Sequence, residues 1–209
     1  INMKRNEKIE KLLNKYQNYI HINFDLINIE KIKDLYISKI KKIGEIYGLV
    51  NNSAIAYDDI VTNVNIEKLN NMFNINVYAP IILTKYAIRD MLLNNNKGSI
   101  VHVSSVSAHT GYKGLSMYAS TKGALEAFSK NIAREWGVKG IRSNCVAPGF
   151  METSISAGLT DEQRQKIYKR TSLKKATDII STAKTIEFLL SENAKSITGS
   201  IIRVDNGTI

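Results

Sequence analysis

Short apolar runs alternate with amphipathic stretches of helical period along the sequence, and this alternation is its strongest constraint on the fold. Strands that alternate with helices of such length form βαβ units, in which helices cover both faces of a parallel sheet. We therefore expect an α/β fold with a doubly wound parallel sheet, organised as a single domain over residues 1–209. The expected strands are 1–3, 19–24, 47–50, 99–104, 141–146 and 201–204, and the expected helices are 7–16, 29–46, 66–93, 117–136, 160–169 and 179–190.

Polar or turn-forming residues directly follow three of these strands. Asn51 and Asn52 follow the third expected strand, Ser105 the fourth, and Pro148 and Gly149 the fifth. In open parallel sheets, ligands bind in the crevice beyond the carboxyl ends of the strands. The sequence therefore predicts a site at this edge of the sheet.

Tyr118 and Lys122 lie four residues apart in the expected helix 117–136, so their side chains share one helix face. A free tyrosine has a pKa of about 10, and a nearby positive charge moves that pKa towards neutrality. If the preceding loop folds back, the Ser105 hydroxyl could hydrogen-bond the same substrate oxygen as the tyrosine. This arrangement suits proton transfer to or from a carbonyl or alcohol oxygen, although Tyr-x-x-x-Lys spacing also occurs by chance in many helices.

Pro80 lies inside the long expected helix 66–93 and has no N–H to donate to the carbonyl of Asn76. We therefore expect a free carbonyl and a kink at Asn76, where an ordered water could be held. The alternative is that the proline only marks a helix boundary.

The chain carries a formal charge of +10 and a single cysteine, Cys145. Its lysines are spread along the expected helices without interleaved aromatic residues, which favours solvated helix faces over a nucleic-acid surface. No apolar run is long enough to cross a membrane, and His21, His102 and His109 lack metal-ligand spacing. The cysteine content favours a reducing compartment. We therefore expect a cytoplasmic protein without metal, membrane or nucleic-acid partners, whose charge is compatible with an acidic partner.

Taken in order, several motifs resemble those of the short-chain dehydrogenase/reductase family over residues 4–207. The stretch 140–153 is similar to the 3-oxoacyl-[acyl-carrier-protein] reductase branch. The resemblance implies a Rossmann-like fold with strand order 3-2-1-4-5-6-7. The motifs are Asn51-Asn52-Ser53-Ala54, Asn76 with Pro80, Ser105 with Tyr118 and Lys122, Pro148-Gly149 with Thr153, and Asp205-Asn206-Gly207.

The resemblance also implies a catalytic tetrad. Tyr118 would be the general acid/base, and Ser105 would orient and polarise the carbonyl. Lys122 would lower the Tyr118 pKa and hold the nicotinamide ribose, while the Asn76 carbonyl would hold a water. The cofactor-binding residues that we expect are Lys4, Arg5, Asn23, Asn51, Asn52, Ser53, Ala54, Tyr118, Lys122, Pro148, Gly149, Met151 and Thr153.

Cofactor choice is expected to depend on Lys4 and Arg5, at the end of what the resemblance makes the second strand. An acidic residue there would bind the ribose 2′-hydroxyl of NAD(H), whereas two cations suit the 2′-phosphate of NADP(H). We therefore expect NADP(H) to be preferred over NAD(H). The alternative is a solvated pair of cations at a helix start.

The family's first βα unit, with its glycine-rich turn, has no counterpart in these residues. Without it, the expected strand order leaves a central gap of about 9–10 Å. We expect the native chain to have an upstream portion. If it does, that portion could include a targeting segment, so organellar targeting is an open alternative. The other interpretation is a short protein that does not bind a dinucleotide in the usual way.

Three functions remain open at this point. The first is reduction of a carbonyl to a secondary alcohol, with a 3-oxoacyl thioester on acyl-carrier protein as the substrate that the resemblance suggests. The second is the same chemistry on a sugar, a steroid or another small alcohol or ketone. The third is a non-catalytic relative that acts as an interaction protein. The resemblance also implies a homotetramer or homodimer.

Overall fold

Four parallel strands form one sheet in the computed structural model, which describes the whole chain except residues 2–6, 154, 155, 157 and 209. Their order is β1-β2-β3-β4, which matches strands 4-5-6-7 of the expected order. The prediction of a parallel α/β sheet is thus confirmed. The strands are β1 (Gly48–Asn51), β2 (Gly98–Val103), β3 (Ile141–Pro148) and β4 (Ile201–Val204).

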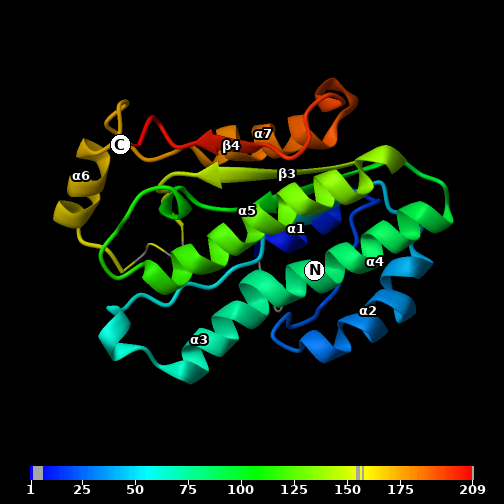
Figure 1. Cartoon of the computed structure of the whole chain (residues 1–209), viewed down its shortest axis with the longest axis horizontal. Coiled ribbons are helices and arrows are strands. Elements are labelled where there is room, and N and C mark those ends of the chain that lie inside the picture. The colour runs from blue at the N-terminus through cyan, green and yellow to red at the C-terminus, as the bar shows by residue number, and fades with distance from the viewer. Residues whose placement is uncertain (2–6, 154–155, 157, 209) are drawn as a thin grey trace.

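A helix precedes each of these strands, and helices also follow β1, β2 and β3 (Figure 1). The ends of most of these helices fall within one or two residues of the ends predicted from the sequence. Within the part of the chain that the structure describes, no helix is both long enough and apolar enough to cross a membrane. The α-helices are α1 (Glu7–Lys15), α2 (Ile32–Ser38), α3 (Ile66–Phe73), α4 (Ala79–Leu93), α5 (Ser116–Trp136), α6 (Asp161–Lys169) and α7 (Ile179–Leu190).

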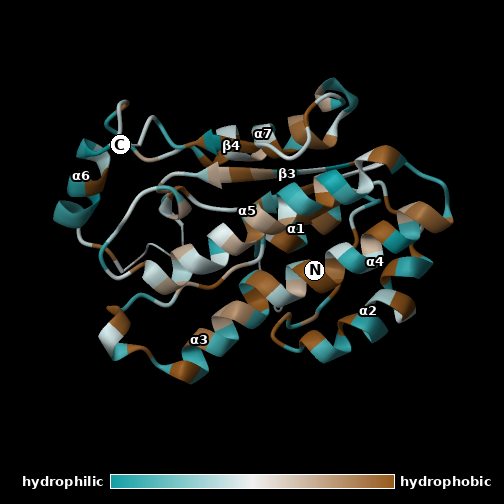
Figure 2. Cartoon of the chain, in the orientation of Figure 1, coloured by the Kyte–Doolittle hydropathy of each residue, from teal (hydrophilic) through white to brown (hydrophobic). Residues whose placement is uncertain are grey.

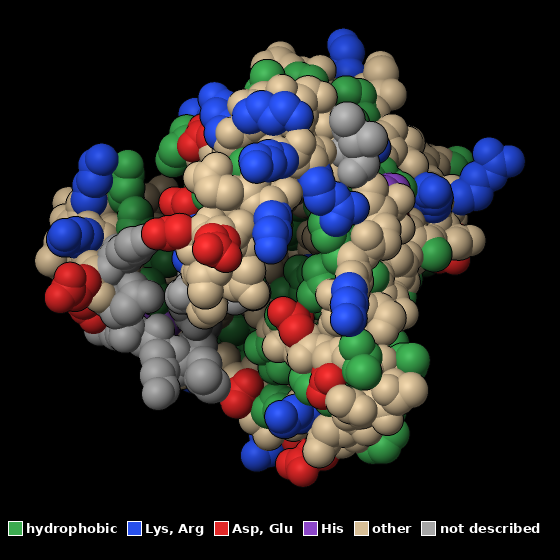
Figure 3. Space-filling model, turned by 90° about the vertical axis from the view of Figure 1, so that its left-hand side faces the viewer, with side chains coloured by type: hydrophobic (Ala, Val, Ile, Leu, Met, Phe, Trp, Pro, Cys, Tyr) green, Lys and Arg blue, Asp and Glu red, His purple; other side chains and the backbone are tan. Residues whose placement is uncertain are grey.

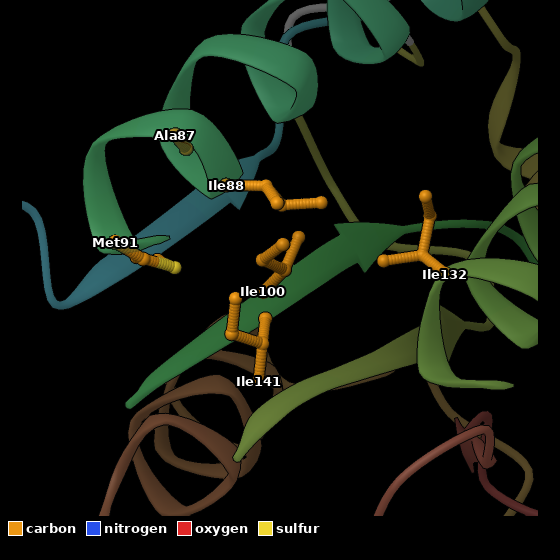
Figure 4. Close-up of a cluster of buried hydrophobic side chains, with 6 residues drawn as sticks. All are labelled: Ala87, Ile88, Met91, Ile100, Ile132 and Ile141. Atoms are coloured by element: carbon orange, nitrogen blue, oxygen red, sulfur yellow. The ribbon is translucent and has the colours of Figure 1, made fainter. Parts of the chain in front are cut away.

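Helices α4 and α5 pack on one face of the sheet, and α7 packs on the other (Figure 1). Successive residues of β2 point to opposite faces, so Ile100 joins the α4–α5 side and Val101 the α7 side. Figure 4 shows Ile100 beside Ile88, Ile132 and Ile141 in the first of these two cores. The strand is buried along its whole length, as a parallel strand between two helical layers should be.

Local sequence signals explain where several helices begin. The Asn65 side chain caps α3, and the Asp178 carboxylate accepts from the backbone N–H groups of Ile180 and Ser181 at the start of α7. Thr160 and Gln163 form a capping box at α6. Figure 2 shows that α6 is mostly hydrophilic, whereas hydrophobic and hydrophilic residues alternate along α4. The caps therefore matter most for α6, which has little apolar surface to bury.

The long expected helix 66–93 is interrupted by a π-helical turn, Asn74–Tyr78, between α3 and α4. Pro80 stands in the first turn of α4, where its missing N–H is tolerated. The predicted distortion around Asn76 is therefore present, as a widened turn that joins two helices. Turns of this kind are frequent at functional sites.

Two predicted elements differ from the structure. Residues 29–46 form α2 flanked by the 3₁₀ turns Ile29–Lys31 and Ile40–Lys42, because the helical backbone ends at Lys39 (φ −124°). Residues 19–24 were expected to be a strand, but Asn23 forms only an isolated bridge there. A strand needs a hydrogen-bonded neighbour along its length, and the described residues supply none. The expected strand 1–3 lies largely outside the described residues.

Strand β1 lies at the edge of the sheet that the described residues form. It pairs with β2 from Gly48 opposite Ser99 to Asn51 opposite His102. Val50 is 37% exposed, which is unusual for a strand of a parallel sheet.

Candidate active site

The carboxyl ends of the strands, the loop after β2 and the first turns of α5 meet on one side of the molecule. In Figure 1, the arrows of β3 and β4 point to this side, and Figure 3 looks straight onto it. Its surface carries both basic and acidic side chains, rather than one uninterrupted basic area (Figure 3). This is where the sequence predicted a site.

Lys122 is almost completely buried, with 2% of its surface exposed. Its Nζ donates a hydrogen bond of 2.8 Å to the carbonyl oxygen of Val103 and lies 5.5 Å from the ring centroid of Tyr118. Burial lowers the pKa of Lys122 to about 8. The predicted proximity of Lys122 and Tyr118 is present.

The expected lowering of the Tyr118 pKa is wrong for the structure as it stands. Burial raises the pKa of Tyr118 to about 12, and the nearby negative charge of Asp58 also raises it, while a hydrogen bond with Ser105 acts in the opposite direction. Helix spacing indicated that a cation would be near, but not that the phenol would be desolvated. The Lys122 ammonium lies over the ring and is bonded to Val103. At neutral pH the Tyr118 phenol therefore carries its proton.

Ser105 is the second residue after β2 and caps the short 3₁₀ helix η5 (Val106–Ala108). Its Oγ accepts hydrogen bonds from the backbone N–H of Ser107 at 3.2 Å and from the Ser107 hydroxyl at 3.0 Å. The Ser105 side chain therefore has a defined position beside the Tyr118 phenol.

Asn76 is fully buried in the π-helical turn. Its side-chain amide makes two bonds of 2.9 Å to the backbone of Ile55, accepting from the N–H and donating to the carbonyl. It also donates to Thr121 Oγ1 at 3.1 Å. Because Thr121 precedes Lys122 on α5, Asn76 joins the loop after β1 to the helix that carries Tyr118 and Lys122. The structure thus brings the four expected catalytic residues together.

Apart from Tyr118 and Lys122, the expected cofactor residues lie in several separate parts of the chain. Lys4 and Arg5 lie outside the described residues. Pro148 ends β3, and Gly149, Met151 and Thr153 come directly after it in the chain, while Asn52 and Ser53 are exposed after β1. Asn23 is also exposed, and it borders a surface pocket together with His21 and Lys39.

Three residues of these motifs show how the backbone is held. A Cβ at Gly149 would lie 2.6 Å from Thr177 Oγ1 and 2.8 Å from Asp205 Cα, so this turn requires glycine. Asn206 adopts a φ of 57°, which asparagine tolerates. Ala54 is not among the described residues with positive φ, so it carries no such strain.

Asn51 does not project freely from the end of β1. Its Nδ2 donates to Thr84 Oγ1 and to His102 Nδ1, both at 3.2 Å. His102 is fully buried against Phe128, and burial lowers its pKa to about 4. The side chain of Asn51 therefore links the end of β1 to α4 and β2 in the interior next to the site.

Three charged or polar residues near the tetrad were not predicted to belong to the site: Asp58, His109 and Glu126. Asp58 was missed because it lies on an irregular loop, with no motif to mark it. Glu126 follows Lys122 by four residues, so the same helix-face argument that paired Tyr118 with Lys122 would have placed it on this face.

Comparisons with known proteins agree with this geometry. Residues 1–208 match the family model described as Enoyl-(Acyl carrier protein) reductase. The chain is 33% identical over 199 residues to the 3-oxoacyl-[acyl-carrier-protein] reductase FabG of Buchnera aphidicola subsp. Baizongia pistaciae (strain Bp), covering 94% of this chain and 81% of that protein. It is 34% identical over 167 residues to Carbonyl reductase [NADPH] 2 of Sus scrofa, covering 79% and 68%.

Solved structures show the same fold. A 4-hydroxyisoleucine dehydrogenase mutant complexed with NADH and succinate aligns with a TM-score of 0.90 at 25% identity, over 97% of this chain and 84% of that one. A blue fluorescent protein from a metagenomic library, in complex with NADPH, aligns with a TM-score of 0.81 at 26% identity, over 89% and 74%.

Proposed function

This chain belongs to the short-chain dehydrogenase/reductase family, and on that premise we propose that it is an NADP(H)-dependent reductase that converts a carbonyl to a secondary alcohol. The substrate that we propose is a 3-oxoacyl thioester on acyl-carrier protein. The observation that carries the proposal is the convergence of the Ser105 hydroxyl, the Tyr118 phenol and the buried Lys122 ammonium at one strand end.

Tyr118 would give the proton in this reaction. Because the pKa of its phenol is about 12, the group is protonated at neutral pH and can donate to the oxygen of the carbonyl as negative charge develops there. The Ser105 hydroxyl, which is held beside the phenol, would donate a second hydrogen bond to the same oxygen. When bound, the nicotinamide cofactor supplies the hydride.

Lys122 has the chemistry to hold the ribose of such a cofactor. Its ammonium has three hydrogens, and the hydrogen bonds among the described residues give it one acceptor, the Val103 carbonyl. A buried cation with unused donors suits a pair of neighbouring hydroxyl groups. The residues present therefore fit a nicotinamide nucleotide.

Preference for NADP(H) rests on Lys4 and Arg5 and stays a proposal. One relative is named Carbonyl reductase [NADPH] 2, and the structural neighbours include one complex with NADPH and one with NADH, so the comparisons support a nicotinamide cofactor of either kind. The test is the Kd of the natural protein for NADPH and NADH. We expect tighter binding of NADPH, and loss of that difference in a Lys4→Ala/Arg5→Ala double variant. A Lys11→Ala/Lys15→Ala variant on the exposed side of α1 should keep the difference, and equal affinity in the wild type would refute the preference.

The substrate is tested by comparing kcat/KM for a 3-oxoacyl thioester on acyl-carrier protein with kcat/KM for small ketones. Several relatives are named 3-oxoacyl-[acyl-carrier-protein] reductase, and the charge of +10 suits an acidic carrier. We expect the carrier-bound thioester to be preferred at least tenfold. Higher activity on free ketones would favour the second candidate, which the similarity to the carbonyl reductase supports.

We also propose a homodimer or homotetramer that forms through residues 66–93, which include α3 and α4, and through α5. Apolar residues of these helices such as Ile88 and Ile132 pack in the core of the chain, whereas Ile66 and Leu93 are exposed apolar residues that could contact a second copy. Light scattering of the natural protein measures its mass in solution, and a monomer at all concentrations would contradict this proposal.

A further inference from the structure

Glu126 places a carboxylate inside the protein, one turn after Lys122 on α5. The residue is 7% exposed, although ionised carboxylates are rarely buried unless they are paired. Such a group costs stability unless hydrogen-bond donors satisfy it, so its partners indicate what it does.

Both partners of Glu126 come from the loop that carries Ser105. Glu126 Oε1 accepts a hydrogen bond of 2.5 Å from the Ser104 hydroxyl and lies 2.9 Å from His109 Nε2. The Ser104 Oγ is also 3.4 Å from the carbonyl oxygen of Lys122. One carboxylate oxygen therefore ties two points of the loop to one turn of α5.

These two points enclose the expected catalytic serine. Ser104 precedes Ser105, and His109 caps the carboxyl end of η5, through the backbone bond from its N–H to the Val106 carbonyl. Between them, Ser107 donates two hydrogen bonds to the Ser105 hydroxyl oxygen. Fixing both ends of this segment therefore fixes the position of the serine hydroxyl.

We propose that Glu126 is a positioning residue, which holds Ser105 in its reactive place by binding Ser104 and His109 at the two ends of the serine loop (residues 104–109). This inference rests on the proposed function in one respect, the role of Ser105 in catalysis. The hold on the loop itself is independent of that function and is measured separately.

The experiment compares Glu126→Ala with Glu126→Gln in the full natural protein. Alanine removes the acceptor, whereas glutamine keeps an oxygen at the Oε1 position. We expect Glu126→Ala to lower kcat with a 3-oxoacyl thioester by about 10- to 100-fold, as loss of a precisely placed group does, while the Kd for NADPH changes less than threefold. Glu126→Gln should recover most of the lost kcat. Glu135→Ala, an exposed position on the same helix, is the matched control and should keep wild-type kcat.

A second readout follows the loop directly, through hydrogen exchange of the backbone amides of residues 104–109. Glu126→Ala should speed exchange of these amides at least tenfold more than exchange of the β3 amides. If kcat falls while their protection is unchanged, the positioning role is refuted. It is also refuted if folded Glu126→Ala keeps wild-type kcat.

Two outcomes of this experiment require an additional measurement. If the wild-type protein reduces no carbonyl, the proposed function fails, and the exchange measurement still decides whether Glu126 holds the loop. If Glu126→Ala does not fold, Ser104→Ala and His109→Ala each remove one contact and should each lower kcat severalfold with faster loop exchange. Wild-type kcat and wild-type protection in both of these variants would overturn the inference.

Discussion

Lys122 on α5 and Val103 on β2 are joined by a hydrogen bond from the lysine ammonium to the main-chain carbonyl, at 2.8 Å. The bond links the first turns of α5 to Val103, the last residue of the strand that leads to Ser105. It also explains how a lysine that is 2% exposed keeps a fixed position. A buried ammonium with one acceptor is costly, and that cost should be measurable as a dependence of stability on pH.

The first prediction is that Lys122→Met abolishes one component of this pH dependence. The pKa of Lys122 is about 8 in the folded chain and about 10.5 in an unfolded one. Between these values the unfolded state binds the proton and the folded state does not, so the free energy of unfolding rises as the pH rises. We expect this component to amount to about 2 kcal/mol between pH 8 and pH 10, measured by urea unfolding.

Lys130→Met is the control, because Lys130 is exposed on the same helix. Its pH profile should run parallel to that of the wild type. If Lys122→Met also runs parallel to the wild type, Lys122 is not the group that titrates in this window.

Tyr118→Phe should remove proton donation and leave the rest of the site in place. We expect kcat for carbonyl reduction to fall by about 10²- to 10⁴-fold, the usual range for loss of a general acid. The Kd for NADPH, followed by fluorescence, should stay within threefold of the wild-type value. Tyr78→Phe, at a position that is 47% exposed, should leave both quantities unchanged. Carbonyl reduction at the wild-type rate in Tyr118→Phe would rule out the proton role.

Asn76→Ala should release the loop that follows β1. The substitution removes the two bonds to the Ile55 backbone and the bond to Thr121, all of which involve a fully buried amide. We expect the free energy of unfolding to fall by about 2 to 4 kcal/mol and the Ile55 amide to exchange faster. Asn70→Ala, at an exposed position of α3, should change stability by less than about 0.5 kcal/mol. An unchanged Ile55 exchange rate in folded Asn76→Ala would contradict this role.

His102→Asn should make the protein less sensitive to acid. The pKa of His102 is about 4 in the folded chain, against about 6.5 when unfolded, because burial disfavours its cation. Between these values the unfolded state binds the proton, so stability falls as the pH falls. The wild type should lose about 2 kcal/mol more than His102→Asn between pH 7 and pH 5. Equal losses in the two proteins would show that another group controls this acid response.

Much of the fold could be predicted because the core depends on periodicity, which is a local property of the sequence. The buried run around Ile100 and the helical stripe that includes Ile132 each mark one side of the same core. The tetrad could be placed for a related reason, since Ser105, Tyr118 and Lys122 lie on one strand end and one helix turn. Their relative positions follow from local geometry together with the parallel sheet.

The remaining features depend on contacts between distant segments. The pKa of Tyr118 is set by burial and by Asp58, which lies 60 residues earlier in the chain, so helix spacing predicted the wrong direction. Residues 19–24 were predicted to be a strand, but only Asn23 forms a bridge. A strand requires a neighbouring strand to pair with, and the periodicity of one segment does not show whether such a neighbour exists. The bond between Asn76 and Ile55 similarly joins two segments that no local signal connects.

The π-helical turn at Asn74–Tyr78 determines how α4 is rotated about the helix axis relative to α3. One additional residue in a turn offsets everything beyond it by about 100°. This offset lets the Asn76 amide face Thr121 while Ala87 and Met91 further along face the sheet. Deleting a single residue there would turn residues 66–93 into regular α-helix. Either the Asn76 amide would then no longer face Thr121, or the apolar residues of α4 would no longer face the sheet. The length of this turn should therefore tolerate change far less than most of the side chains within it.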